Sequence, residues 1–115
     1  MDQQITKQSI IQWNVNGLKY HLNDVQLLLQ NYQPFCLSIQ ETHLSPGESF
    51  SLRGYNVFRR DEPPLHKAKG GVAVLLLNSL PARHITLDTH LQAVAVHIDF
   101  PLSLTICSLY LPDGH

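Results

Sequence analysis

Residues 36–44, CLSIQETHL, join an apolar, strand-like run to a carboxylate at its end. Side chains of a β-strand alternate between two faces, so Phe35, Leu37 and Ile39 are expected to share one face. Glu41 continues that face at the carboxyl end of the run. A charge in line with core residues is costly unless a partner compensates for it. Either the strand has left the core by Glu41, or a cation binds there.

The residues before this stretch predict a strand, a helix and then the strand itself. Residues 8–13 have the pattern of a first strand, which ends at the turn signal Asn14-Val15-Asn16-Gly17. Apolar residues then recur at helical spacing, which predicts an amphipathic helix over residues 20–31. Pro34 ends that helix, and residues 35–40 form the second strand. This order is a βαβ unit, in which the two strands are parallel.

The residues after it predict a series of strands joined by loops. Apolar runs predict strands over residues 54–59, 71–77, 91–100 and 102–111. Pro101 fits the turn between two antiparallel partners. A βαβ unit followed by an antiparallel series indicates one domain of the α/β class (α+β by some schemes), built as a layered sandwich.

Composition favours a soluble globular protein. The chain has 115 residues, of which 43% are hydrophobic and 15% charged, with a net charge of -1. No apolar stretch approaches the roughly 20 residues of a membrane helix, and the amino terminus lacks the pattern of a signal peptide. Cys36 and Cys107 both lie in apolar runs, so we expect two free, buried thiols in a reducing compartment.

Basic residues are concentrated in one part of the chain. Five of the eight lysines and arginines fall between positions 53 and 69 (Arg53, Arg59, Arg60, Lys67, Lys69). Asp61 and Glu62 interrupt this group. A solvated loop is therefore favoured over a nucleic-acid-binding patch.

Polar residues lie at the ends of three predicted strands: Asn14 with Asn16, Glu41, and Tyr110. Ligands of open sheets bind beyond the carboxyl ends of strands, where loops converge. Each residue also has an ordinary explanation, as a turn asparagine, a solvated glutamate or a tyrosine at the rim. The seven histidines show no metal-binding spacing. The residues alone predict a site for a hard cation with oxygen ligands around Glu41.

Four segments taken together resemble a known family: IIQWNVNGL, IQETHL, KGGVAVLL and LTICSLYLPDGH. In this order and at these intervals they resemble the amino-terminal half of the endonuclease/exonuclease/phosphatase superfamily, and most closely the endonuclease domain of jockey-like non-LTR retrotransposons. The resemblance implies the amino-terminal half of a four-layer, DNase-like α/β sandwich. It also implies cleavage of DNA with Mg²⁺ or Mn²⁺, a reverse transcriptase in the same polyprotein, and action in the nucleus.

The resemblance also implies roles for individual residues. Glu41 matches a metal ligand of the family, and Asn16 matches a metal-site position that is often aspartate in repair nucleases. Asn14 matches an asparagine that orients catalytic groups or the phosphate. Tyr110 matches a tyrosine whose hydroxyl contacts the scissile phosphate. Gly70-Gly71 matches glycines with a structural role.

The sequence departs from the family in one respect. The later family motifs, Asp-x-Asn and Ser-Asp-His, are absent from residues 1–115, so the Asp–His pair that would activate water is missing. We therefore expect a partial domain that is inactive alone and marginally stable. With most of the second sheet lacking, strands 71–77 and 102–111 should expose an apolar face and an open edge.

Two other functions stay open at this point. One is a remnant that is inactive or only binds. The other is a phosphoinositide-type phosphatase of the same superfamily.

Overall fold

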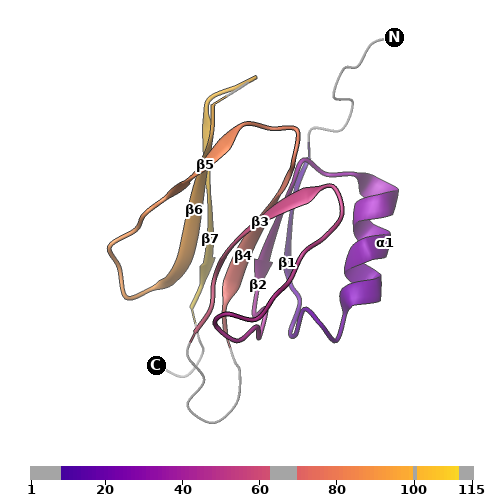
Figure 1. The fold of residues 1–115 in the computed structure, drawn as a ribbon, viewed down its shortest axis with the longest axis vertical. Helices are drawn as coiled ribbons and strands as arrows, with labels where there is room; N and C mark the ends of the chain where they lie inside the picture. Colours follow the sequence, from indigo (N-terminus) through magenta and orange to yellow (C-terminus); the bar gives the residue numbers. More distant parts are fainter. Residues whose placement is uncertain (1–8, 63–69, 100, 112–115) are drawn as a thin grey trace.

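The computed structural model describes residues 9–62, 70–99 and 101–111, which form two β-sheets and an α-helix in three layers (Figure 1). The fold expected from the sequence, an α/β sandwich, is confirmed; three of the four layers implied by the resemblance are seen in these residues. The elements in chain order are β1 (Ile10–Asn14), α1 (Leu22–Tyr32), β2 (Cys36–Gln40), β3 (Tyr55–Arg60), β4 (Val72–Leu77), β5 (Ala82–Ile85), β6 (Gln92–Ile98) and β7 (Leu104–Tyr110).

The first sheet, called sheet A, has the strand order β1-β2-β4-β3. β1 and β2 are parallel and are joined by α1, so the predicted βαβ unit is confirmed. β4 lies antiparallel between β2 and β3. It is therefore a central strand with a partner on each side, and the expectation of an open edge at residues 71–77 was wrong.

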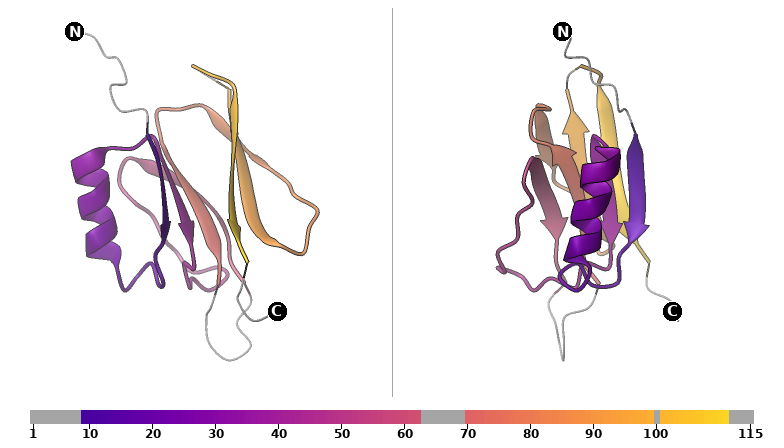
Figure 2. Two further views of the ribbon diagram at one scale, coloured as in Figure 1. Left: turned by 180° about the vertical axis from the view of Figure 1, so that it is seen from behind. Right: turned by 90° about the vertical axis from the view of Figure 1, so that its right-hand side faces the viewer.

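Helix α1 covers the outer face of sheet A (Figure 2). Its Val25 and Leu29 are buried against that face, as the helical spacing predicts. The helix ends where Gln33 adopts a left-handed conformation, with φ of 45°, and donates its backbone N–H to the Leu29 carbonyl at 2.9 Å. In the part of the chain that the structure describes, no helix is long and apolar enough to cross a membrane.

The second sheet, called sheet B, has the antiparallel order β5-β6-β7 and lies on the other side of sheet A. Strand β5 was not predicted, because its four residues include Arg83 and His84 and show no apolar run. The described residues thus supply three strands of the second sheet. A shared core fills the space between the sheets (Cys36, Val72, Val74, Leu76, Leu80, Val94, Val96, Ile98, Ile106).

The two faces of β2 differ from the expected pattern at one residue. Leu37 and Ile39 pack on the helix side of sheet A, as expected from alternation. Phe35 precedes the strand and packs instead between the sheets, in the same core as Cys36. Burial raises the pKa of the Cys36 thiol to about 12.

The expectation of a second buried thiol was wrong. Both cysteines are free, but Cys107 is exposed. In β7, Ile106 and Ser108 point into the sandwich, so the residue between them points outward. The expected exposure of apolar groups on this strand is seen at Leu109, which lies on the same outer face, and β7 is an edge of sheet B.

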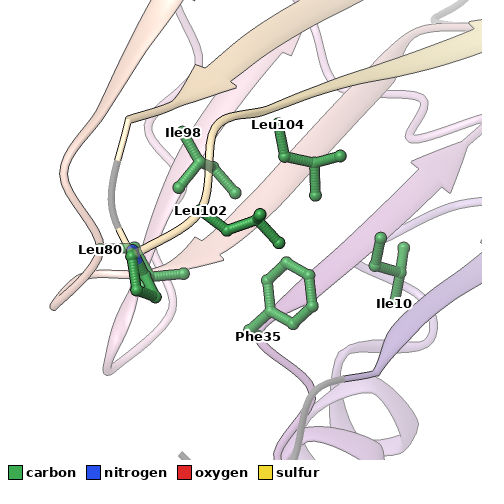
Figure 3. Close-up of a pocket in the computed structure, with 7 residues that line it drawn as sticks. Ile10, Phe35, Leu80, Ile98, Leu102 and Leu104 are labelled. Carbon is green, nitrogen blue, oxygen red and sulfur yellow. The ribbon is translucent and has the colours of Figure 1, made fainter.

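One end of the sandwich is hollow and apolar (Figure 3). There the start of β1 faces the turn between β6 and β7 across a cavity of about 390 Å³ (lined by Ile10, Phe35, Leu80, Ile98, Pro101, Leu102, Leu104). The polar strand ends predicted from the sequence lie at the opposite end of the molecule.

Candidate active site

The carboxyl ends of β1, β2 and β7 lie at the same end of the sandwich, the lower end in Figure 1. Asn14 is the register partner of Gln40, so the loop after β1 begins beside the loop after β2. Tyr110 is the last residue of β7 and pairs with Gln92, the first residue of β6. The candidate residues predicted from the sequence are therefore brought to one end.

Asn14 and Glu41 are in direct contact. The Asn14 Nδ2 group donates a hydrogen bond to Glu41 Oε2 at 3.3 Å. The Glu41 side chain is 22% exposed, so its carboxylate is partly accessible at this end of the sandwich. We call this end, where β1, β2 and β7 end, the rim. Asn14 thus fixes one oxygen of this carboxylate, a geometry that suits an orienting residue.

The backbone around Glu41 is strained. Glu41 and His43 have φ angles of 58° and 57°, a left-handed conformation that non-glycine residues rarely adopt. Thr42, between them, is 1% exposed. This conformation places the buried Thr42 inside the fold while Glu41 and His43 remain at the rim. Such strain persists only where the surroundings hold it, and it often marks functional sites.

Five backbone hydrogen bonds hold this strained segment in place. They connect it on one side to the loop after β1 and on the other to the glycines before β4 (Val15 N to Gln40 O, 3.0 Å; Gly17 N to Glu41 O, 2.8 Å; Leu18 N to Thr42 O, 2.9 Å; Thr42 N to Gly71 O, 3.2 Å; His43 N to Gly70 O, 2.9 Å). The loops after two neighbouring strands therefore act as one rigid unit.

Gly70 and Gly71 permit this close approach. Their φ angles are 71° and 90°. A Cβ on Gly71 would lie 2.5 Å from Thr42 Oγ1, and one on Gly70 would lie 2.5 Å from Gln92 Oε1. Gln92 Oε1 accepts a hydrogen bond from the Gly71 backbone N–H at 2.8 Å. The structural role of the two glycines thus has a physical reason. A side chain at position 71 would push against Thr42, next to Glu41, and one at position 70 would displace the Gln92 side chain.

Asn16 lies in the loop after β1, exposed and left-handed, with φ of 52°. It directly precedes Gly17, whose N–H is bonded to the Glu41 carbonyl. The structure therefore places the Asn16 backbone next to that of Glu41.

Tyr110 reaches the same rim through Ser108. The Ser108 hydroxyl donates to the Ile39 carbonyl at 3.1 Å and accepts from Gln40 Nε2 at 3.0 Å, so β7 packs on the carboxyl end of β2. Tyr110 is two residues further along and faces the same way as Ser108. Its half-buried ring packs against the core between the sheets.

Sequence reasoning missed a buried polar network between the sheets. Gln40 donates to Ser38 Oγ at 3.2 Å as well as to Ser108, and all three side chains are buried. Within the described residues, Gln40 Oε1 has no hydrogen-bond partner. The alternation of polar and apolar residues could not predict this network, because every residue of β2 is buried on both faces. The network joins β2 to β7 close to the positions of Glu41 and Tyr110 in the chain.

The basic residues of β3 are occupied by acidic neighbours. Arg59 pairs with Asp61 at 3.0 Å, and Arg60 lies 3.7 Å from Glu62 and donates to the Thr89 carbonyl. These ion pairs argue against a free nucleic-acid-binding patch. The two arginines nevertheless lie in a strand and are partly buried, so the solvated-loop interpretation was wrong for them. Lys67 and Lys69 lie outside the described residues. In the preceding loop, hydrogen bonds from the Lys19 ammonium and the Ser45 N–H lower the pKa of Glu48.

The residues of the rim fit an open divalent site. Within the described ranges, no group of three or more His, Cys, Asp or Glu side chains could enclose a metal ion. Glu41 and the amide oxygens of Asn14 and Asn16 are nevertheless hard oxygen donors. Mg²⁺ keeps several waters and is often held by one or two carboxylates together with substrate phosphates. The donor set suits such a weakly held ion.

Known proteins similar to this chain include products of mobile elements of Drosophila melanogaster. This chain is 32% identical over 108 residues to the probable RNA-directed DNA polymerase from transposon BS. The alignment covers 86% of this chain and 12% of that protein. The chain is 32% identical over 71 residues to that of the X-element (62% of this chain, 8% of that protein) and 26% identical over 105 residues to that of jockey (89% and 11%). The chain spans only about a tenth of these relatives.

Solved structures show the same fold. The 3' phosphatase NExo from Neisseria, bound to a product DNA hairpin, matches with a TM-score of 0.68 at 21% identity, covering 88% of this chain and 40% of that one. An AP endonuclease from Archaeoglobus fulgidus matches with a TM-score of 0.67 at 22% identity, covering 91% and 41%. At this level of identity, the likeness concerns the fold alone.

The family model for Endonuclease/Exonuclease/phosphatase proteins matches residues 11–111, which include the carboxyl ends of β1, β2 and β7. Together with the mobile-element relatives, this match confirms the resemblance seen in the sequence. The chain belongs to the Endonuclease/Exonuclease/phosphatase family.

Proposed function

We propose that this chain is the amino-terminal portion of a metal-dependent phosphodiesterase that nicks DNA, encoded in the polyprotein of a non-LTR retrotransposon. The observation that carries the proposal is the Glu41 carboxylate, held at the rim on a strained backbone and fixed by Asn14. A solvated glutamate after a strand needs neither feature. The Drosophila relatives, which are RNA-directed DNA polymerases, support the retrotransposon origin.

In this proposal each rim residue has one task. Glu41, with Asn16 beside it, holds the divalent ion, for which Mg²⁺ or Mn²⁺ is expected. The ion, when bound, neutralises charge on the phosphoryl oxygens and on the leaving group. Asn14 keeps the carboxylate in one orientation. Tyr110 presents a hydroxyl donor to a phosphate oxygen from the opposite sheet. These residues bind and orient the phosphodiester, and the group that would activate water is not assigned.

The test measures nicking of supercoiled plasmid by the longest reading frame that contains these residues. Glu41→Gln keeps the shape of the side chain and removes its charge. We expect a loss of activity of at least about 100-fold, since orienting partners of a metal alone are worth about 10- to 100-fold. Glu48→Gln is a matched control, because its side chain is 23% exposed and lies in the next loop. Activity of the Glu41 variant within about threefold of the unchanged protein would contradict the proposal.

Two further measurements separate the alternatives. Hydrolysis of inositol phosphates in place of plasmid nicking would favour the phosphatase. The 115-residue chain alone is expected to show no nicking, because the Asp–His pair implied by the resemblance is absent from it and general-base catalysis supplies about 10²- to 10⁴-fold. Nicking by the isolated chain would contradict this expectation.

A further inference from the structure

We propose that His43 is a second protein ligand of the Glu41 metal site, and that it favours ions which accept nitrogen ligands over Mg²⁺. This inference rests on the proposed function, because it assumes that Glu41 binds a divalent ion. Carboxylates suit Mg²⁺ and Mn²⁺, whereas imidazole suits Zn²⁺, Ni²⁺ and their neighbours in the first transition row. A mixed pair of ligands would give the site a measurable metal preference.

The distance between the two side chains fits a shared ion. His43 Nε2 lies 3.8 Å from Glu41 Oε1. This separation is too long for a direct hydrogen bond, but it is within the range of an ion pair with a protonated imidazole. Two ligand atoms that are each about 2.1 Å from one ion can be at most about 4.2 Å apart, so the pair can bind one ion without a large movement.

Both side chains are oriented toward this gap by their neighbours. Asn14 donates a hydrogen bond to Oε2 of the carboxylate, and Oε1 is the oxygen nearer the imidazole. The imidazole lies beside Gly17, where the position of a Cβ would be 3.5 Å from His43 Nδ1. With Nδ1 next to Gly17, Nε2 is directed at Glu41.

The backbone at position 43 gives independent support. His43 has φ of 57°, a conformation that glycine adopts without strain. Its N–H is bonded to the Gly70 carbonyl, so the backbone geometry is imposed by the fold whatever the side chain. A histidine in this position is costly for stability. Strain of this kind at two positions that share one rim indicates that the side chains are needed there.

The test measures metal binding by the 115-residue chain itself. Calorimetric titrations with Co²⁺ and with Mg²⁺ compare the unchanged chain with His43→Gly, Glu41→Gln and, as a control, His90→Ala, which alters an exposed histidine in the loop before β6. His43→Gly is chosen because glycine fits the backbone, and its thermal midpoint should be unchanged or higher. In parallel, proton NMR follows the imidazole resonances of the seven histidines as Co²⁺ is added.

We expect His43→Gly to weaken Co²⁺ binding by about tenfold or more and to change Mg²⁺ binding by less than about threefold. Co²⁺ should shift the ring protons of His43 through the metal–nitrogen bond, and this shift should exceed the through-space shift of an imidazole that is only a neighbour of the ion. Equal Co²⁺ binding by His43→Gly, with a loss in Glu41→Gln, would overturn this inference and leave the proposed function intact. If Glu41→Gln binds both ions as well as the unchanged chain does, this inference and the proposed function are both overturned. If the unchanged chain does not bind Co²⁺, only this inference is overturned.

Discussion

The strained backbone at Glu41 leads to a prediction with an unusual sign. In ordinary strands and loops, alanine is more stable than glycine, because glycine has more conformational freedom to lose on folding. At position 41, where φ is 58°, we expect the reverse: Glu41→Gly should be more stable than Glu41→Ala. Both variants lack the carboxylate, so the lost contacts with Asn14 and His43 cancel in the comparison.

The expected size follows from two opposing terms. A left-handed conformation costs a residue with a Cβ roughly 1–2 kcal/mol. Glycine avoids this cost but gives up about 0.5–1 kcal/mol through its greater freedom in the unfolded chain. The net advantage of glycine at position 41 is therefore about 0–1.5 kcal/mol. Asn56, an exposed residue of β3, serves as the control site, where alanine should exceed glycine by a similar amount.

Urea unfolding of the 115-residue chain can measure these differences. Trp13 is the single tryptophan and packs against the core under α1, so its fluorescence reports unfolding. A difference of 1 kcal/mol corresponds to about 0.3–1 M in the midpoint for m-values of about 1–3 kcal/mol/M. If alanine exceeds glycine at position 41 by as much as it does at position 56, the backbone at position 41 is not left-handed, and the strain gives no support to a functional site.

Three further predictions concern the surroundings of the site. A thiol reagent should label Cys107 rapidly in the folded chain and should reach Cys36, whose thiol is buried with a pKa of about 12, only after unfolding; two rapidly labelled thiols would contradict this. Gly71→Ala should lower the free energy of unfolding by about 2 kcal/mol more than Gly47→Ala. Both glycines have positive φ, but only Gly71 faces Thr42 Oγ1, so equal losses would rule out the close contact. Ser108→Ala should cost about 1–3 kcal/mol through its buried partners, whereas Cys107→Ala on the outer face of the same strand should cost less than about 0.5 kcal/mol.

The elements with a clear period or a strong end signal could be predicted from the sequence. The βαβ unit was predictable because Leu22, Val25 and Leu29 recur at helical spacing and Pro34 stops the helix. Strand β5 was not, since a strand of four residues leaves too short a pattern. The burial of Cys107 was predicted wrongly. Sheet B is covered on one face only, and an apolar run does not show which of its alternating residues point to that face.

The site shows the same limit. The convergence of Asn14, Asn16 and Glu41 follows from parallel strands, and sequence reasoning anticipated it. The left-handed backbone at Glu41 and His43 depends on hydrogen bonds to Gly70 and Gly71, which are distant in the chain, so no local pattern encodes it. The Gln40 network was not predicted for a related reason. Polar residues in a strand are expected to be exposed to solvent, and their burial becomes clear only when the hydrogen-bond partner on the opposite sheet is known.

The position of β4 in sheet A has a consequence for folding kinetics. This strand follows β3 in the chain but lies between β2 and β3, and its residues enter both cores, Ala73 and Leu75 under α1 and Val72, Val74 and Leu76 between the sheets. Before β4 docks, β3 has no neighbour in sheet A and β2 has an unpaired edge. Pairings between distant segments are slow to form. The folding nucleus is therefore expected to require β4, and a nascent chain that has not yet produced this strand should be vulnerable to aggregation and to proteases.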